Sequence, residues 1–94
     1  MPKLAFVEKR IFEIEGFQVE FLDKDDKNVR SDKLLPKQYE AEKMSKNSFT
    51  VSEYKEKLTK QFPGYKFNIL RSDGKKASGQ TNLSTVRDTY LADE

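Results

Sequence analysis

The side chains in this sequence that could carry out chemistry are carboxylates, amines and hydroxyls, because the chain contains no histidine and no cysteine. Zinc sites with the usual ligands, cysteine nucleophiles and serine–histidine dyads are therefore excluded. A general acid would need a carboxyl group held away from water, as an Asp or Glu inside an apolar segment would be. Glu13, Glu15 and Glu20 alternate with apolar residues, so we expect all three to face solvent. The sequence thus predicts no catalytic residue and a protein that is not an enzyme.

The acidic segment 23–28 does not match a calcium-binding loop. A loop that begins at Asp23 would have a lysine, Lys27, at the fifth ligand position and Leu34 at the twelfth. The four glycines are single and widely spaced, so they form no phosphate-binding glycine loop. We therefore expect no metal site and no cofactor, and we interpret 23–28 as a solvated turn.

Basic residues gather around the segment 66–79 and form a candidate basic patch. Three of them flank one turn, one lies on the outer side of a predicted strand, and one approaches from the last predicted helix. A patch of this kind could contact phosphates of a nucleic acid. The alternative is a solvated surface around an exposed turn, which the balanced charge of the chain favours. The members of the basic patch are Lys66, Arg71, Lys75, Lys76 and Arg87.

Length and composition predict one small domain, residues 1–94, rather than two. Apolar residues make up 35% of the chain, but seven Phe and four Tyr give enough buried area for a core. The net charge of +2 does not by itself imply a polyanionic partner. No apolar run has the length of a signal peptide or a membrane span, and the lack of cysteine suits a reducing cytoplasm. We expect a cytoplasmic protein with no membrane association.

The segment 49–71 gives the clearest prediction of secondary structure. Thr50 and Glu53 have the spacing of a capping box, and apolar residues follow at intervals of three and four as far as Phe62. Pro63 and the glycine after it end this helix. Alternating apolar residues then predict a half-buried strand over 65–71.

A β-hairpin is predicted over 10–22. Phe12 and Ile14 occupy even positions, whereas Phe17 and Val19 occupy odd ones, and the parity changes at Gly16. A two-residue turn there would place all four side chains on one face. The alternative is one long strand with a glycine bulge.

The remaining segments carry weaker signals. Residues 23–28 form a turn that returns through Val29, and 30–49 is a long loop in which Pro36 could open a short helix. The apolar residues of this loop could pack on the sheet or bind a partner; they are Leu34, Leu35, Tyr39 and Met44. Asp73-Gly74 predicts a turn with a short return strand, and 82–91 a short final helix.

These elements predict an α+β fold with a small antiparallel sheet: an N-terminal hairpin, a central helix, a C-terminal strand or hairpin, and a short terminal helix. We expect the helices to lie mostly on one face of the sheet. The order loosely resembles the β-grasp arrangement over about two thirds of the chain, without any diagnostic residue.

The function expected from these observations is a small non-catalytic module that binds another protein. The alternative is a weak nucleic-acid-binding protein that uses the basic patch. Small accessory proteins of phages and mobile elements have similar size and charge. If residues 4–15 form an edge strand, the chain could pair with its own copy, so monomer and homodimer both remain open.

Overall fold

The chain begins with a helix where the sequence pattern favours a strand. In the computed structural model, which describes residues 1–41 and 43–91, α1 spans Leu4–Glu15. Its buried positions, among them Leu4, Val7 and Ile11, are spaced by three and four. Gly16 has a φ of 82°, and its N–H donates to the carbonyl of Phe12 at 2.9 Å, which closes the helix. The parity change at Gly16 is therefore a helix end.

The predicted hairpin over 10–22 is wrong for this reason. A helical stripe and a pair of strands with opposite parity place apolar residues at many of the same positions. The residues that distinguish the two lie before position 10, where Leu4 and Val7 extend the helical spacing. Strand pairing between two copies through residues 4–15 is wrong as well, because these residues are helical.

The sheet consists of two antiparallel strands within the described residues, β1 (Gln18–Leu22) and β2 (Lys66–Leu70). Val19 and Phe21 pair with Ile69 and Phe67, and all four side chains are buried. Residues at the intervening positions point to the other face, which is partly exposed. One apolar face and one wet face are the usual result of alternation in an antiparallel sheet.

The helix α2 (Val51–Gln61) confirms the prediction from the capping box. The Thr50 hydroxyl accepts from the N–H of Glu53 at 3.2 Å, and the Glu53 carboxylate accepts from the N–H of Thr50 at 3.1 Å. The predicted strand after Pro63 is β2. The predicted final helix is α3 (Leu83–Leu91), which buries Leu83 and Val86.

Short arms return along both strands, as the turn signals predict. Leu22 bridges to Asn28, and the N–H of Val29 donates to the carbonyl of Phe21 at 3.1 Å. At the other strand Leu70 bridges to Lys76. Each arm therefore covers the edge of one strand near the last residue of that strand.

The long loop contains no helix in its described parts, 30–41 and 43–49, so the optional helix after Pro36 is not found there. Leu35 and Tyr39 are buried and pack this loop into the core. Leu34 and Met44 remain about half exposed, at 51% and 49%. Two of the four apolar residues of the loop therefore pack into the core, and the other two lie at the surface.

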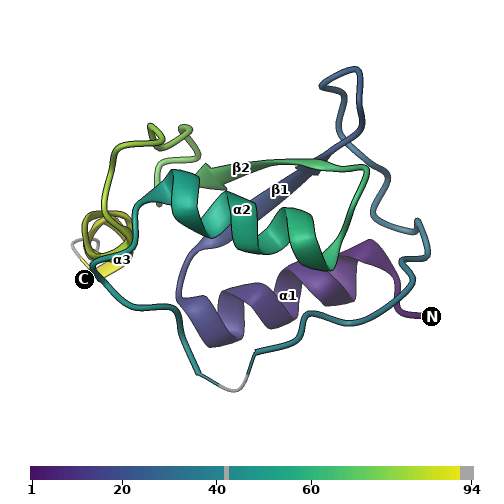
Figure 1. Ribbon diagram of the computed structural model, residues 1–94, viewed down its shortest axis with the longest axis horizontal. Helices are drawn as coiled ribbons and strands as arrows, with labels where there is room; N and C mark the ends of the chain where they lie inside the picture. The colour runs from purple at the N-terminus through teal and green to yellow at the C-terminus, as the bar shows by residue number, and fades with distance from the viewer. Residues whose placement is uncertain (42, 92–94) are drawn as a thin grey trace.

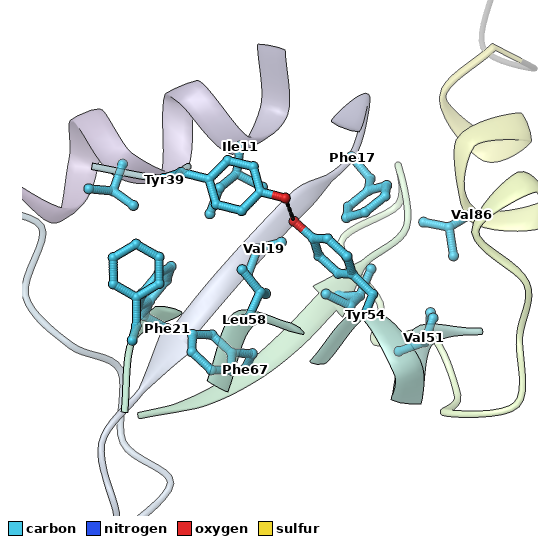
Figure 2. Close-up of a cluster of buried hydrophobic side chains, with 14 of the residues drawn as sticks. Ile11, Phe17, Val19, Phe21, Tyr39, Val51, Tyr54, Leu58, Phe67 and Val86 are labelled. Atoms are coloured by element: carbon cyan, nitrogen blue, oxygen red, sulfur yellow. Dashed lines mark hydrogen bonds between the residues drawn. The ribbon is translucent and has the colours of Figure 1, made fainter. Parts of the chain in front are cut away.

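The helices α1 and α2 cover the same face of the sheet, and α3 lies beside the end where β1 begins and β2 stops (Figure 1). The core between them is built largely from aromatic rings packed edge to face, including Phe17 on Tyr54 and Phe21 on Phe67 (Figure 2). Phe12 is an exception, since its side chain is on the outer side of α1 and is 41% exposed.

The predicted fold class, a small α+β fold with its helices mostly on one face, is confirmed. The observed order is helix, strand, helix, strand, helix. The β-grasp order requires an N-terminal hairpin. The observed order begins with a helix and therefore does not match it.

Candidate functional site

The five residues of the basic patch do not gather on one surface. Lys66 begins β2 and forms an ion pair with Asp26 at 3.2 Å. Arg71 follows the other end of this strand, roughly 16 Å away at the usual rise per residue. Lys75 and Lys76 share the turn with Arg71. Three of the five residues are therefore brought together.

Arg87 lies in the interior, where oxygen atoms bind its guanidinium group. Nε donates to the backbone carbonyl of Glu15 at 2.6 Å, and Nη2 donates to the Oε1 atom of Glu15 at 3.0 Å. Nη1 donates to Oδ1 of Asn47 at 2.6 Å. The guanidinium also lies over the ring of Phe17, 5.4 Å from its centroid. Because its side chain is only 9% exposed, Arg87 does not join the basic patch.

The carboxylate of Glu15 is fully buried, so the prediction that it faces solvent is wrong. It accepts hydrogen bonds from the Tyr39 hydroxyl, from the Ser45 N–H at 2.7 Å and from the Ser45 hydroxyl at 3.1 Å. Tyr54 donates its hydroxyl to that of Tyr39 at 2.9 Å (Figure 2). Burial, and then the hydrogen bond to Glu15, raises the pKa of Tyr39, and burial also raises the pKa of Tyr54. Both tyrosines therefore stay protonated and act as donors.

These contacts form the Glu15–Arg87 network, which joins α1, α2, α3 and the loop 30–49. Among the described residues every buried side-chain nitrogen and oxygen has a hydrogen-bond partner. A satisfied network of this kind fixes a fold, whereas a catalytic site keeps a group free to meet its substrate. We therefore assign the network a structural role.

The sequence contains a partial signal for this network. Glu15 stands four residues after Ile11, on the stripe that also carries Leu4 and Val7, so a helical interpretation would have placed it inside. Its partner Arg87 lies 72 positions further along the chain. No local pattern links two residues at that separation.

A groove on the surface, the α1–β1 groove, has a different character. It has a volume of about 460 Å³ and lies between the outer side of α1 and the start of β1. The ring of Phe12 forms part of its wall and is held at the edge of Tyr90, with 5.8 Å between the ring centroids. The lining residues are Ala5, Glu8, Lys9, Phe12, Gln18, Val19, Glu20 and Leu70.

The floor of this groove is fixed by hydrogen bonds. The hydroxyl of Tyr90 donates to the carbonyl of Leu70 at 2.6 Å and accepts from the N–H of Gln18 at 2.9 Å. The Tyr90 hydroxyl therefore bridges the two strands at Gln18 and Leu70, which form the last pair of the β1–β2 ladder. Asn68 donates to the carboxylate of Glu20 at 3.1 Å, which holds that side chain over the sheet.

Two carboxylates share the α1–β1 groove. Glu8 is half buried, and this burial raises the pKa of its carboxyl group. The amide of Phe21 opposes that shift, whereas the nearby charge of Glu20 adds to it. The groove thus holds two like charges, one of them partly removed from water, beside an exposed aromatic ring.

A second surface feature, the loop–α3 hollow, lies beside the turn that carries Arg71. It has a volume of about 380 Å³. Two basic side chains and four hydroxyl-bearing side chains contribute to its lining, together with two small apolar ones. The lining residues are Arg71, Lys76, Ala77, Ser78, Thr81, Thr85, Val86 and Thr89.

Within residues 1–41 and 43–91, no three side chains of the ligating types are close enough together to hold a metal ion. None of the helices in this part of the chain has both the length and the apolar composition to cross a bilayer. Comparison of the chain with protein-family models, with curated proteins and with solved structures found no match.

Proposed function

We propose that this protein is a small non-catalytic binding module, and that its α1–β1 groove receives a lysine or arginine side chain of another protein. The observation that carries the proposal is the combination of Phe12, Glu8 and Glu20 around one groove. We further propose a cytoplasmic location, with which a chain without cysteine is compatible.

The charges of the groove favour a cation as its occupant. Glu8 and Glu20 repel each other, and a positive group between them would relieve this repulsion and donate two charge-assisted hydrogen bonds, one to each carboxylate. The ring of Phe12 can stack against the same group, because the face of an aromatic ring attracts cations. Lys9 also lines the groove, so the bound cation has to lie on the side of the two carboxylates.

The apolar surface favours a protein rather than a free ion. The chain has a low apolar content, yet α1 leaves Phe6 59% exposed and Phe12 41% exposed. An aliphatic stem of a lysine or arginine can cover such a ring while its charged end reaches the carboxylates. A metal ion would use the carboxylates but gain nothing from the ring.

Selection from a library of randomised displayed peptides tests this proposal. We expect the selected peptides to be enriched in lysine or arginine beside an apolar residue. Replacing both carboxylates (Glu8→Gln with Glu20→Gln) should weaken a selected peptide about tenfold, as the loss of a charged hydrogen bond does. Glu56→Gln, a change on the exposed side of α2, is the matched control and should leave the affinity unchanged.

Two results would contradict the proposal. One is a set of selected peptides without any preference for basic residues. The other is a basic peptide that binds the double glutamine variant as tightly as it binds the unchanged protein.

A further inference from the structure

The loop–α3 hollow differs from the α1–β1 groove in the sign of its charge. Both charged residues in its lining, Arg71 and Lys76, are basic and exposed. Arg71 has one weak ion pair, with Asp73 at 3.9 Å. Both cations are therefore available to an anion from solvent.

The residues around this hollow are held in fixed relative positions. The N–H of Arg71 donates to the carbonyl of Lys75, and the N–H of Ala77 donates to the carbonyl of Ile69, both at 2.8 Å. Gly74 has a φ of 83°, which makes the tight turn between them possible. These bonds form the loop into a short hairpin on β2.

A further hydrogen bond attaches this hairpin to α3. The N–H of Ser72 donates to the hydroxyl of Thr89 at 3.1 Å, and that hydroxyl donates to the carbonyl of Val86 at 2.6 Å. Thr89 is therefore used to position the loop, and its hydroxyl proton is not free for a ligand. The loop and the helix form one pre-organised wall.

Other hydroxyl groups in the lining keep a proton to donate. Ser78 and Thr81 lie 3.1 Å apart and share one hydrogen bond, so one of their two hydroxyl protons remains available. The hydroxyl of Thr85 makes no hydrogen bond with any residue in the described ranges, and Thr85 is exposed. The hollow therefore offers two cations and two neutral donors.

A phosphate group has the chemistry that matches these donors. It carries negative charge on several oxygens, each of which can accept hydrogen bonds from different directions. Arginine binds phosphate through its planar set of N–H groups, and lysine adds a point charge. A carboxylate, with two oxygens in one plane, would leave part of the donor set unused.

We propose that the loop–α3 hollow binds a phosphate group, with Arg71 and Lys76 supplying charge and the hydroxyls of the Ser78–Thr81 pair and Thr85 supplying neutral hydrogen bonds. The site retains two members of the basic patch and does without Lys66, Lys75 and Arg87. It is independent of the α1–β1 groove, which has the opposite charge. The phosphate belongs either to a small phosphate ester or to the backbone of a nucleic acid.

Titration of ¹⁵N-labelled protein with inorganic phosphate tests the site. We expect saturable shifts of the amides of Ala77, Thr85 and Thr89. Arg71→Gln should weaken binding about tenfold, because it removes a charged hydrogen bond. Thr85→Val keeps the charge and volume of the site and should weaken binding severalfold.

Lys66→Gln is the matched control, since it removes one positive charge at the far end of β2. Its affinity should stay within about twofold of the unchanged protein, as expected for a distant exposed charge. Equal weakening by Lys66→Gln and Arg71→Gln would reveal diffuse attraction and overturn the proposal. So would shifts that fail to saturate or that avoid α3.

The same titration with a nucleoside monophosphate and with a short single-stranded oligonucleotide identifies the source of the phosphate. Tighter binding of the oligonucleotide, with an affinity that falls steeply as salt rises, assigns the site to a nucleic acid. Tighter binding of the monophosphate assigns it to a small phosphate ester. If neither compound moves the three amides, the proposed site is wrong.

Discussion

At the scale of single residues, the structure contains an unusual feature in Glu15, a carboxylate with no exposure to solvent. Its burial is tolerated because Arg87 neutralises it and because Tyr39 and Ser45 donate to its oxygens. An unpaired charge in the same place would cost several kcal/mol. Local alternation around Glu15 suggested exposure, and the partners that justify burial are distant in sequence. Sequence patterns therefore missed this buried charged pair.

Removal of Arg87 is expected to destabilise the fold strongly. Arg87→Met leaves the Glu15 charge buried without its partner, so the free energy of unfolding in urea should fall by about 3–5 kcal/mol. Arg71→Met removes an exposed arginine and should change it by less than about 0.5 kcal/mol. The double variant Glu15→Gln with Arg87→Met should recover part of the loss, because no charge is left inside. An Arg87→Met protein as stable as the Arg71→Met control would refute the structural role of this pair.

Alkaline pH should reveal the buried tyrosines. The pKa values of Tyr39 and Tyr54 are raised above the ordinary 10.0, so the unfolded chain loses phenolic protons that the folded chain retains. Their contribution to stability is complete below about pH 10 and declines as pH rises further. Tyr39→Phe should make the decline in unfolding free energy shallower than it is in the unchanged protein. Identical pH profiles for Tyr39→Phe and the unchanged protein would contradict this assignment.

At the scale of elements, the sequence predicts β1, as the second arm of the hairpin, and α2, β2 and α3, but not α1. The capping box at Thr50 and the stop at Pro63 are local signals that fit a helix and no other kind of element. The segment before Gly16 lacks such a cap, since Lys3 makes no side-chain hydrogen bond at the start of α1. Its glycine is compatible with both a turn and a helix end. The helix forms because its stripe of apolar residues packs on β1, a contact that local patterns do not report.

Gly16 provides a test of the helix end. An alanine side chain at this position would contact Arg87 at 3.8 Å without a clash, so the cost of Gly16→Ala comes from its φ of 82°. We expect a loss of about 1–2 kcal/mol in the free energy of unfolding. Gly16→Asn should cost less, because asparagine tolerates this conformation. Equal stability of the alanine variant and the unchanged protein would show that the residue is not left-handed.

At the scale of the whole molecule, most of the core follows from composition, whereas neither surface site does. Phe17, Phe21 and Phe67 meet in the interior as an aromatic core requires. The α1–β1 groove depends on the helical form of residues 4–15, because the helix sets Glu8 and Phe12 one turn apart beside the start of β1. Since sequence patterns predicted a hairpin there, they could not bring Glu8 next to Glu20. The loop–α3 hollow likewise required the contact between Ser72 and Thr89.

Site-specific photo-crosslinking in the native cell tests the binding surface most directly. A photoreactive phenylalanine analogue at position 12 lies on the α1–β1 groove, and the same analogue at Lys60 lies on the exposed side of α2. We predict a discrete protein adduct from position 12, lost when Glu8 and Glu20 are both replaced by glutamine, and none from position 60. An adduct from position 60 alone, or one from position 12 that survives the loss of both carboxylates, would contradict the account.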